Sequence, residues 1–301
     1  MPITNPATRG TSRTFEYRGK VDRIEDKRLV DWKSVSDPQD FLNSRAVGYQ
    51  GELYTLALAH CGIDITEIAY RLVKRPTIKF CNKDKTADDY EARCVEWLRT
   101  TDGTITETVL PINRARLEQA RQWLWNISQR LLQCRRSNCW LTNENACNNT
   151  YGRHCEFLPL CLVQSQGGDV EWIIGEQYEP KEVHEELDDI PAEKDVITYS
   201  SATKFTLCEA RYYFQHERKI GPKSEVTPIS RWTGSAFHVG MDVVQEQGVE
   251  AALIAIGDWA DNNPIIGPEA YHTQQQHIAQ ARAIVRCAWE VWGVRTVERK
   301  V

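Results

Sequence analysis

Two aspartates and a lysine near the N-terminus have the types and spacing of a hydrolytic metal site. Asp22, Asp31 and Lys33 stand among apolar residues in the stretch YRGKVDRIEDKRLVDWKSV, residues 17–35. Burying an isolated charge is costly, so a buried carboxylate usually faces a partner charge or a metal ion. Two carboxylates beside an ammonium group suit Mg²⁺ or Mn²⁺, which prefer oxygen ligands. Such an ion would polarise a phosphodiester and activate water, while Lys33 would orient that water or offset developing charge.

The local pattern predicts a β-hairpin that would position these three side chains. Residues 15–24 and 28–34 alternate in the manner of strands, and a short polar turn joins them. Side chains two apart on a strand share a face, so Asp31 and Lys33 point the same way. Asp22 can face the same pocket from the neighbouring strand. An acid–any–Lys tripeptide is common, but the apolar setting and the preceding GKVD distinguish this one.

Beyond the hairpin, hydrophobic periodicity predicts a mixture of helices and strands. Helices are expected over 37–60, 87–99, 113–134, 200–218, 233–247 and 273–292, and strands over 65–75 and 294–301. The cysteine-rich stretch between them, 134–161, is expected to be irregular.

Composition and charge predict a globular protein of three parts. The 301 residues are 41% hydrophobic and include ten tryptophans, enough to build a core. Residues 166–196 are acidic and poor in apolar side chains, which is typical of a linker. The expected division is therefore 1–165, a linker over 166–196, and 197–301. The net charge of −5 neither indicates nor excludes nucleic-acid binding, because a basic channel can lie on an acidic protein.

The same numbers bear on location and on the ten cysteines. No run of about 18 apolar residues exists, so no membrane span is expected. The N-terminus lacks the apolar centre of a secretory signal, so we expect a soluble, intracellular and cytoplasmic protein. Ten cysteines without such a signal favour metal or redox use over a disulfide scaffold.

The motifs around the acidic residues resemble a known nuclease family. GKVDRI followed by LVDWKS resembles motifs II and III of the RecB-like branch of the PD-(D/E)XK nuclease superfamily. The family's next motif, a glutamine followed four residues later by a tyrosine, is matched by Gln50 and Tyr54 in QGELY, which lie on one helical face. The resemblance implies an α/β restriction-endonuclease-like core, a small mixed sheet flanked by helices.

The resemblance also implies a cysteine cluster and a further metal ligand. Cys147, Cys155 and Cys161 in ACNNTYGRHCEFLPLC resemble three ligands of a [4Fe–4S] cluster, and Cys208 in TYSSATKFTLCEARYYFQH resembles the fourth. TGSAFHVGMD resembles motif I, which nominates His238 as a ligand of the divalent metal together with Asp22 and Asp31. A local zinc knot of Cys139, Cys147, Cys155 and Cys161, with Cys134 able to replace one of them, is the alternative.

The family's motifs occur here in circularly permuted order. The chain begins just before motif II and presents the first cysteine and the motif I histidine only after residue 197. Three arrangements are consistent with this order: a permuted single domain, a piece of a longer tandem protein, or a half-exchanged homodimer. The favoured one is a single site closed within one chain.

The expected function is a Mg²⁺- or Mn²⁺-dependent deoxyribonuclease, an exonuclease by resemblance, that acts on DNA with a single-stranded end. Asp22, Asp31, Lys33, Gln50 and Tyr54 are its expected catalytic residues, and a helicase or recombination partner in DNA repair is a further expectation. Basic side chains expected to contact the DNA backbone are Arg23, Lys74, Arg75 and Lys79.

Two alternatives belong to other functional classes. One is a non-catalytic nucleic-acid-binding or assembly protein that keeps the fold and the cysteines without a complete metal site. The other is a zinc-knot regulatory protein in which the acidic pair is incidental.

Overall fold

The fold is built from two compact units, each assembled from three segments of the chain. The computed structural model describes residues 1–147, 154–181, 193–223, 229–265 and 270–293. Unit 1 comprises Met1–Lys20, Tyr49–Thr66 and Ile112–Glu225. Unit 2 comprises Val21–Gly48, Glu67–Pro111 and Val226–Val301. Both units therefore take residues from both halves of the sequence.

Unit 2 contains a mixed four-stranded sheet and four helices. In chain order its elements are β3 (Arg23–Glu25), β4 (Arg28–Val35), α1 (Pro38–Val47), β5 (Glu67–Lys74), α3 (Ala87–Thr100), β6 (Ile105–Pro111), α10 (Ile229–Asn262) and α11 (Ala270–Trp292). The strand order is β3-β4-β5-β6. β4 and β5 are parallel, and the two outer pairs are antiparallel.

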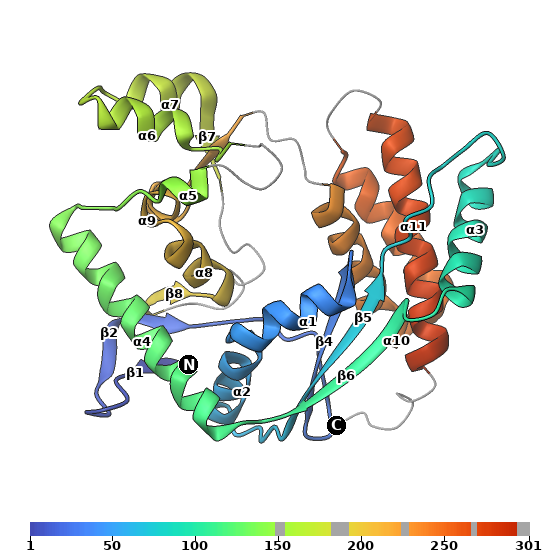
Figure 1. Cartoon of the computed structure of the whole chain (residues 1–301), viewed down its shortest axis with the longest axis horizontal. Helices are drawn as coiled ribbons and strands as arrows, with labels where there is room; N and C mark the ends of the chain where they lie inside the picture. The colour runs from blue at the N-terminus through green and yellow to red at the C-terminus, as the bar shows by residue number, and fades with distance from the viewer. Residues whose placement is uncertain (148–153, 182–192, 224–228, 266–269, 294–301) are drawn as a thin grey trace. The chain divides into compact units, whose positions relative to one another are not determined.

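One face of this sheet belongs to the core of unit 2. Val30 and Trp32 of β4 lie on that face, beside Ala69 of β5 in the parallel register. Helices α3, α10 and α11 pack against one another and supply the rest of this core (Figure 1). Because side chains alternate along a strand, the neighbours of Val30 and Trp32, which include Asp31, point to the opposite face.

Helix α1 contacts that opposite face. Asp31 is registered beside Tyr70 of β5, and Phe41 of α1 meets Tyr70 edge to face with ring centroids 5.7 Å apart. Asp37 caps the N-terminus of α1 by accepting a hydrogen bond from the Asp40 N–H. The face that carries Asp31 and Tyr70 is thus contacted by α1, whereas the face that carries Val30 and Trp32 meets the apolar core.

A glycine divides the long helix α10. Gly248 has φ +83° and ψ 177°, in the left-handed half of the backbone map that favours glycine. The helix expected over 233–247 ends at this residue, as predicted. A second helical segment continues to Asn262.

Unit 1 holds the N-terminal strands, the Gln50–Tyr54 helix and the cysteine-rich region. In chain order its elements are β1 (Pro2–Thr4), β2 (Thr11–Tyr17), α2 (Gln50–His60), α4 (Arg114–Ser137), α5 (Glu144–Cys147), α6 (Leu158–Ser165), α7 (Glu171–Gln177), β7 (Tyr178–Pro180), β8 (Asp195–Ile197), α8 (Tyr199–Leu207), α9 (Glu209–Tyr212), a π-helical turn (Tyr213–Glu217) and β9 (Ile220–Pro222). The strand β2 pairs with β1 and, in parallel, with β8, while β7 pairs with β9.

Two apolar clusters stabilise unit 1. The larger packs Phe15 and Tyr17 of β2 against residues of α2, α4 and α8. The smaller packs Phe157, Tyr178 and Phe214 together, and the half-buried Cys155 and Cys161 lie against it. The cysteine-rich region therefore has an apolar core of its own.

Three expected elements differ in detail from the structure. The strand expected over 15–24 is two strands, because the chain leaves β2 after Tyr17 and begins β3 only at Arg23. The helix expected over 37–60 is interrupted at Gly48. The strand β6 was not predicted, although Ile105, Glu107 and Val109 alternate after the turn at Gly103; its pairing with β5 identifies it.

The expected acidic linker is partly ordered structure. Residues 171–180 form α7 and β7, because Ile173 and Tyr178 bury their side chains in the smaller cluster of unit 1. Its acidic centre, within 182–192, and the strand expected over 294–301 lie outside the described residues. Within the part of the chain that the structure describes, no helix is both long and apolar enough to cross a bilayer.

Candidate active site

The hairpin of β3 and β4 brings the two aspartates and the lysine together. Asp22 lies just before β3, and its Oδ2 accepts a hydrogen bond of 2.8 Å from the backbone N–H of Trp32. The Lys33 ammonium donates to Asp31 Oδ1 at 2.7 Å and stands 3.7 Å from Asp22 Oδ2. One cation therefore touches both carboxylates, in the arrangement expected from strand alternation.

His238 reaches the same place from a distant part of the sequence. It lies on α10, and its Nδ1 is 3.8 Å from Asp22 Oδ1. More than two hundred positions separate these residues in the chain, and both belong to unit 2. Burial lowers the pKa of His238, and the Asp22 carboxylate opposes this shift. The ring is therefore held toward the neutral state that binds metal ions.

Asp31 is the most enclosed member of the group. The residue is 5% exposed, and its Oδ2 has no hydrogen-bond partner among the described residues. Burial raises the pKa of Asp31, Lys33 opposes that rise, and Asp22 adds to it. A buried carboxylate oxygen without a partner is costly, and a cation ligated at this atom would remove that cost.

Sequence reasoning missed one basic residue at this site. Arg45 of α1 lies within electrostatic reach of Asp31, and its positive charge opposes the rise in the pKa of that carboxyl group. Its guanidinium stacks over the ring of Phe41, 4.7 Å from the ring centroid, and Phe41 in turn contacts Tyr70 beside Asp31. Nothing in the sequence near Arg45 distinguishes it from other surface arginines, because only the packing of α1 on the sheet orients it.

The predicted glutamine and tyrosine lie together on α2, in unit 1. Gln50 donates a hydrogen bond of 3.0 Å from Nε2 to the Tyr54 hydroxyl. The Tyr54 ring also packs on Gly19 so closely that a β-carbon there would lie 2.5 Å from Tyr54 Cε1. Gly19 opens the GKVD stretch and precedes Asp22 by three positions. The catalytic role of Gln50 and Tyr54 remains a prediction.

The four basic residues predicted to contact DNA differ in their surroundings. Arg23 pairs with Glu25 at 3.1 Å and hydrogen-bonds Gln245, so its charge is already compensated. Lys79 is exposed and Lys74 is half-buried. Arg75 donates to the backbone oxygen of Ser34 at 2.9 Å, and burial lowers its pKa. Their part in binding remains a prediction.

The four cysteines of the predicted cluster are neighbours in unit 1. Burial raises the pKa of Cys161 to about 11, and the thiols of Cys155, Cys208 and Cys147 raise it further. The Cys208 thiol also raises the pKa of Cys155, whose backbone N–H donates to the Cys147 carbonyl at 2.8 Å. Cys208, from α8–α9, thus joins three cysteines encoded about fifty positions earlier.

The alternative zinc knot shares Cys147, Cys155 and Cys161 with the cluster and differs by Cys139 or Cys134, which are neighbours of each other. Cys134 is buried on α4, its thiol donates to Glu209 at 3.4 Å, and Cys139 is its thiol neighbour. Neither Cys134 nor Cys139 is among the groups with the largest effects on the pKa of Cys155 or Cys161. Among the described residues, no three His, Cys, Asp or Glu side chains stand as close as the ligands of a bound metal ion do.

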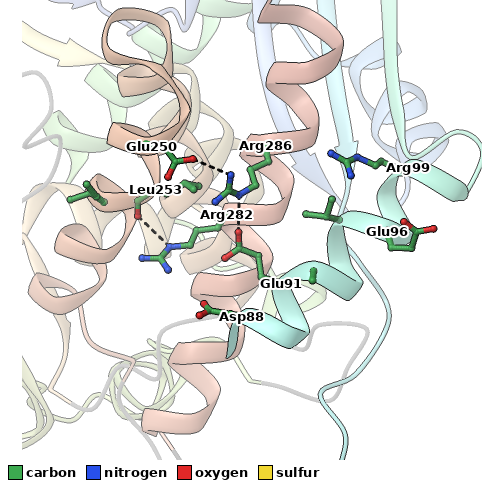
Figure 2. Close-up of a pocket in the computed structure, with 11 residues that line it drawn as sticks. Asp88, Glu91, Glu96, Arg99, Glu250, Leu253, Arg282 and Arg286 are labelled. Carbon is green, nitrogen blue, oxygen red and sulfur yellow. Dashed lines mark hydrogen bonds and ion pairs between the residues drawn. The ribbon is translucent and has the colours of Figure 1, made fainter. Parts of the chain in front are cut away.

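A cavity elsewhere in unit 2 contains none of the predicted catalytic residues. It encloses about 630 Å³ between α3, α10 and α11 and is lined by acidic and basic side chains (Figure 2). Arg286 pairs with both Glu91 and Glu250, and Arg282 donates to the Leu253 carbonyl. These groups hold the three helices together, and none belongs to the Asp31 group.

Comparison with known proteins gives one match. The family model described as the PD-(D/E)XK nuclease superfamily matches residues 6–162, just over half of the chain. No curated protein matches, and no solved structure matches. The matched range includes Asp22, Asp31, Lys33, Gln50, Tyr54 and three of the four cysteines, and it ends before Cys208 and His238.

Proposed function

Because the chain belongs to the PD-(D/E)XK nuclease superfamily, we propose that it is a divalent-metal-dependent nuclease that hydrolyses DNA phosphodiester bonds. One observation carries this proposal. Asp22, Asp31, Lys33 and His238 converge within unit 2, although the histidine is encoded more than two hundred positions after Asp22. Packing alone would not gather two acids, an ammonium group and an imidazole at one point, because buried charge is costly.

The side chains present suit a Mg²⁺ or Mn²⁺ ion. Asp22 and Asp31 would supply carboxylate oxygens and His238 a neutral ring nitrogen, the donors that such ions accept. The Asp31 oxygen without a partner and the lowered pKa of His238 both agree with this ligand set. A bound ion would polarise the phosphodiester and lower the pKa of a water molecule.

The remaining residues of the site would act on the water and on developing charge. In the hydrolysis, the water oxygen bonds to phosphorus, the bond to the leaving sugar oxygen breaks, and that oxygen takes up a proton. Lys33, beside both carboxylates, would orient the water and offset the negative charge on the phosphoryl oxygens. Arg45 would add a second positive charge from α1. The catalytic role of Gln50 and Tyr54, which lie on α2 of unit 1, rests on the motif resemblance alone.

We assign the cysteine quartet a structural metal, a [4Fe–4S] cluster with Zn²⁺ as the alternative. Cys147, Cys155, Cys161 and Cys208 share one environment, which the zinc knot with Cys139 does not require. Thiolates bind either metal. The cluster would tie α8–α9 to the cysteine-rich segment and so couple metal binding to the folding of unit 1.

Finer features of the function follow from the motif resemblance. They are the RecB-like branch, exonuclease action at a single-stranded end, a helicase or recombination partner, and a permuted domain whose site closes within one chain. The 3.8 Å approach of His238 to Asp22 inside a single chain supports closure without exchange of halves between two copies.

A nuclease assay with Mn²⁺ tests the proposal. The near-isosteric Asp31→Asn variant should lose about a thousandfold in cleavage rate, because it removes a ligand charge from the metal site. The matched control is Asp102→Asn, an exposed aspartate of unit 2, which should cleave at the normal rate. Cleavage that survives in Asp31→Asn would exclude this site.

A second candidate is a protein that binds nucleic acid or assembles with it and does not cut. The wide spacing of the candidate ligands among the described residues favours it. Binding of DNA without cleavage by the intact protein, in either Mn²⁺ or Mg²⁺, would support this alternative and contradict the nuclease.

A further inference from the structure

We propose that Arg75 and His277, the latter oriented by the buried Thr233, form an anion-binding subsite that holds a second phosphate of the substrate strand beside the candidate active site. This inference rests on the proposed function, since it assigns the ligand as a phosphodiester of the same strand. The residues come from three elements of unit 2: the end of β5, α11 and the beginning of α10.

The first observation is a half-buried guanidinium without a counter-ion. Arg75 donates from its side chain to the Ser34 carbonyl and from its backbone N–H to the Val35 carbonyl, at 2.9 and 2.8 Å. No carboxylate pairs with it among the described residues. Arg71 and Arg93, by contrast, each pair with an acid that raises the pKa of the guanidinium. An enclosed cation of this kind is stabilised by an anion from outside the chain.

The second observation is the orientation of His277. Its Nδ1 is 3.2 Å from Thr233 Oγ1 and 2.9 Å from Gln280 Oε1. Gln280 Nε2 donates to the Tyr90 hydroxyl and to the Pro76 carbonyl, so Gln280 Oε1 is the acceptor and His277 Nδ1 carries the hydrogen. His277 Nε2 makes no hydrogen bond to the described residues. Burial lowers the pKa of the His277 ring, and the positive charge of the nearby Arg75 lowers it further.

The third observation is the charge of the surrounding segments. Residues 75–83, 229–241 and 270–289 contain no Asp or Glu, in a chain whose net charge is −5. Thr233 lies in the first turns of α10, at the positive end of that helix dipole. Arg75 follows the carboxyl end of β5, which pairs with the carboxyl end of the parallel strand β4. Ser34 Oγ, at the end of β4, is buried without a partner among the described residues. This corner of unit 2 is therefore polar and positively charged.

The position of the subsite relative to the acids fits a neighbouring phosphate. Ser34 follows Asp31 by three residues, which is about 10 Å along a strand. Thr233 precedes His238 by five residues, which is about 7.5 Å along a helix. The side chains of Asp31 and Ser34 point to opposite faces of the sheet, so these separations are those of the backbone. They leave Arg75, which binds the Ser34 carbonyl at the end of the strand, about 10 Å from the candidate metal site, a separation suited to phosphates on the same nucleic-acid strand.

DNA binding by a cleavage-defective protein tests the subsite apart from catalysis. The Asp31→Asn protein is titrated with a fluorescent single-stranded oligonucleotide, and anisotropy is followed over a series of salt concentrations. Adding Arg75→Gln should weaken binding about tenfold and reduce the slope of log K against log salt by about 0.7, the loss of one phosphate contact. Adding Arg99→Gln, an exposed arginine of unit 2 paired with Glu290, should leave the slope unchanged.

Several results would overturn the subsite. Unchanged affinity and slope in Arg75→Gln would do so, and so would weaker binding with an unchanged slope, which indicates a structural role. If Arg75→Gln does not fold, the His277 imidazole signal in the Asp31→Asn protein, assigned with His277→Asn, should still move on addition of the oligonucleotide. A His277 signal that does not move with the oligonucleotide would contradict binding of a phosphate of the nucleic-acid strand. So would a signal that moves with inorganic phosphate but not with the oligonucleotide. If Arg75→Gln weakens DNA binding as expected but the wild-type protein does not cleave DNA, only the proposed nuclease activity is refuted.

Discussion

At the scale of single residues, the Asp31 environment governs what the site can do. Asp31 is buried against Lys33, and Arg45 approaches the same carboxylate from α1. The positions of the two cations have different origins. Lys33 follows from strand alternation two residues after Asp31, whereas Arg45 depends on the stacking of its guanidinium over Phe41.

We expect Arg45→Gln to lower the cleavage rate by about tenfold to a hundredfold, because glutamine removes a positive charge that faces negative charge developing in the transition state. Steady-state kinetics with an oligonucleotide substrate measure the effect, which should fall mainly on kcat. Arg13→Gln, an exposed arginine of β2, is the control and should cleave normally. Normal kcat in Arg45→Gln would remove Arg45 from the site.

At the scale of elements, a buried ion network holds the sheet that carries the site. Arg71 of β5 is 1% exposed and makes paired hydrogen bonds to Glu25 of β3 at 2.8 and 2.7 Å. It also donates to Glu107 of β6 at 2.7 Å. One side chain on a central strand therefore contacts both outer strands of the sheet, including the strand that follows Asp22.

Replacing Arg71 by methionine should destabilise the protein by about 3 kcal/mol, because it removes the buried cation that joins Glu25 to Glu107 and leaves these carboxylates only their other partners, Arg23 and Arg28. Urea unfolding measures the change. The control Arg99→Met removes an exposed arginine that is paired with Glu290 outside this network, and it should leave the free energy of unfolding almost unchanged. Equal effects of the two substitutions would mean that the network contributes no special stability.

At the scale of the whole molecule, each compact unit is closed by segments from both halves of the sequence. In unit 2, α10 brings His238 to Asp22. In unit 1, α8–α9 bring Cys208 to Cys155 and Cys161. In each unit, therefore, a late segment of the chain lies beside an early one, as the motif order proposed from the family resemblance would require.

We expect Cys208→Ser to abolish iron binding and the brown colour of the purified protein, because a four-thiolate cluster loses a ligand. Metal analysis and visible absorbance of Cys208→Ser, Cys139→Ser and Cys287→Ser make the comparison. The other two variants should keep their iron, because Cys139 lies outside the proposed quartet and Cys287 is buried in unit 2. Loss of zinc in Cys139→Ser together with an unchanged Cys208→Ser would establish the local knot instead.

The sequence by itself determined the features that depend on neighbours along the chain. Strand alternation places Asp31 and Lys33 on one face, helical spacing joins Gln50 to Tyr54, and a family pattern spans residues 6–162. These features follow from backbone periodicity, which acts over a few residues and can be seen in a single segment.

Only the tertiary structure decided which distant groups meet. The place of Arg45 near Asp31 and the gathering of Arg75, Thr233 and His277 have no local signal. The stretch around His238 resembles a family motif, but its 3.8 Å approach to Asp22 within one chain is a property of the packing. The strand β6 is also recognised only by its pairing with β5. The physical reason is that such contacts depend on how entire faces of helices and sheets pack, and that packing is a property of the whole core.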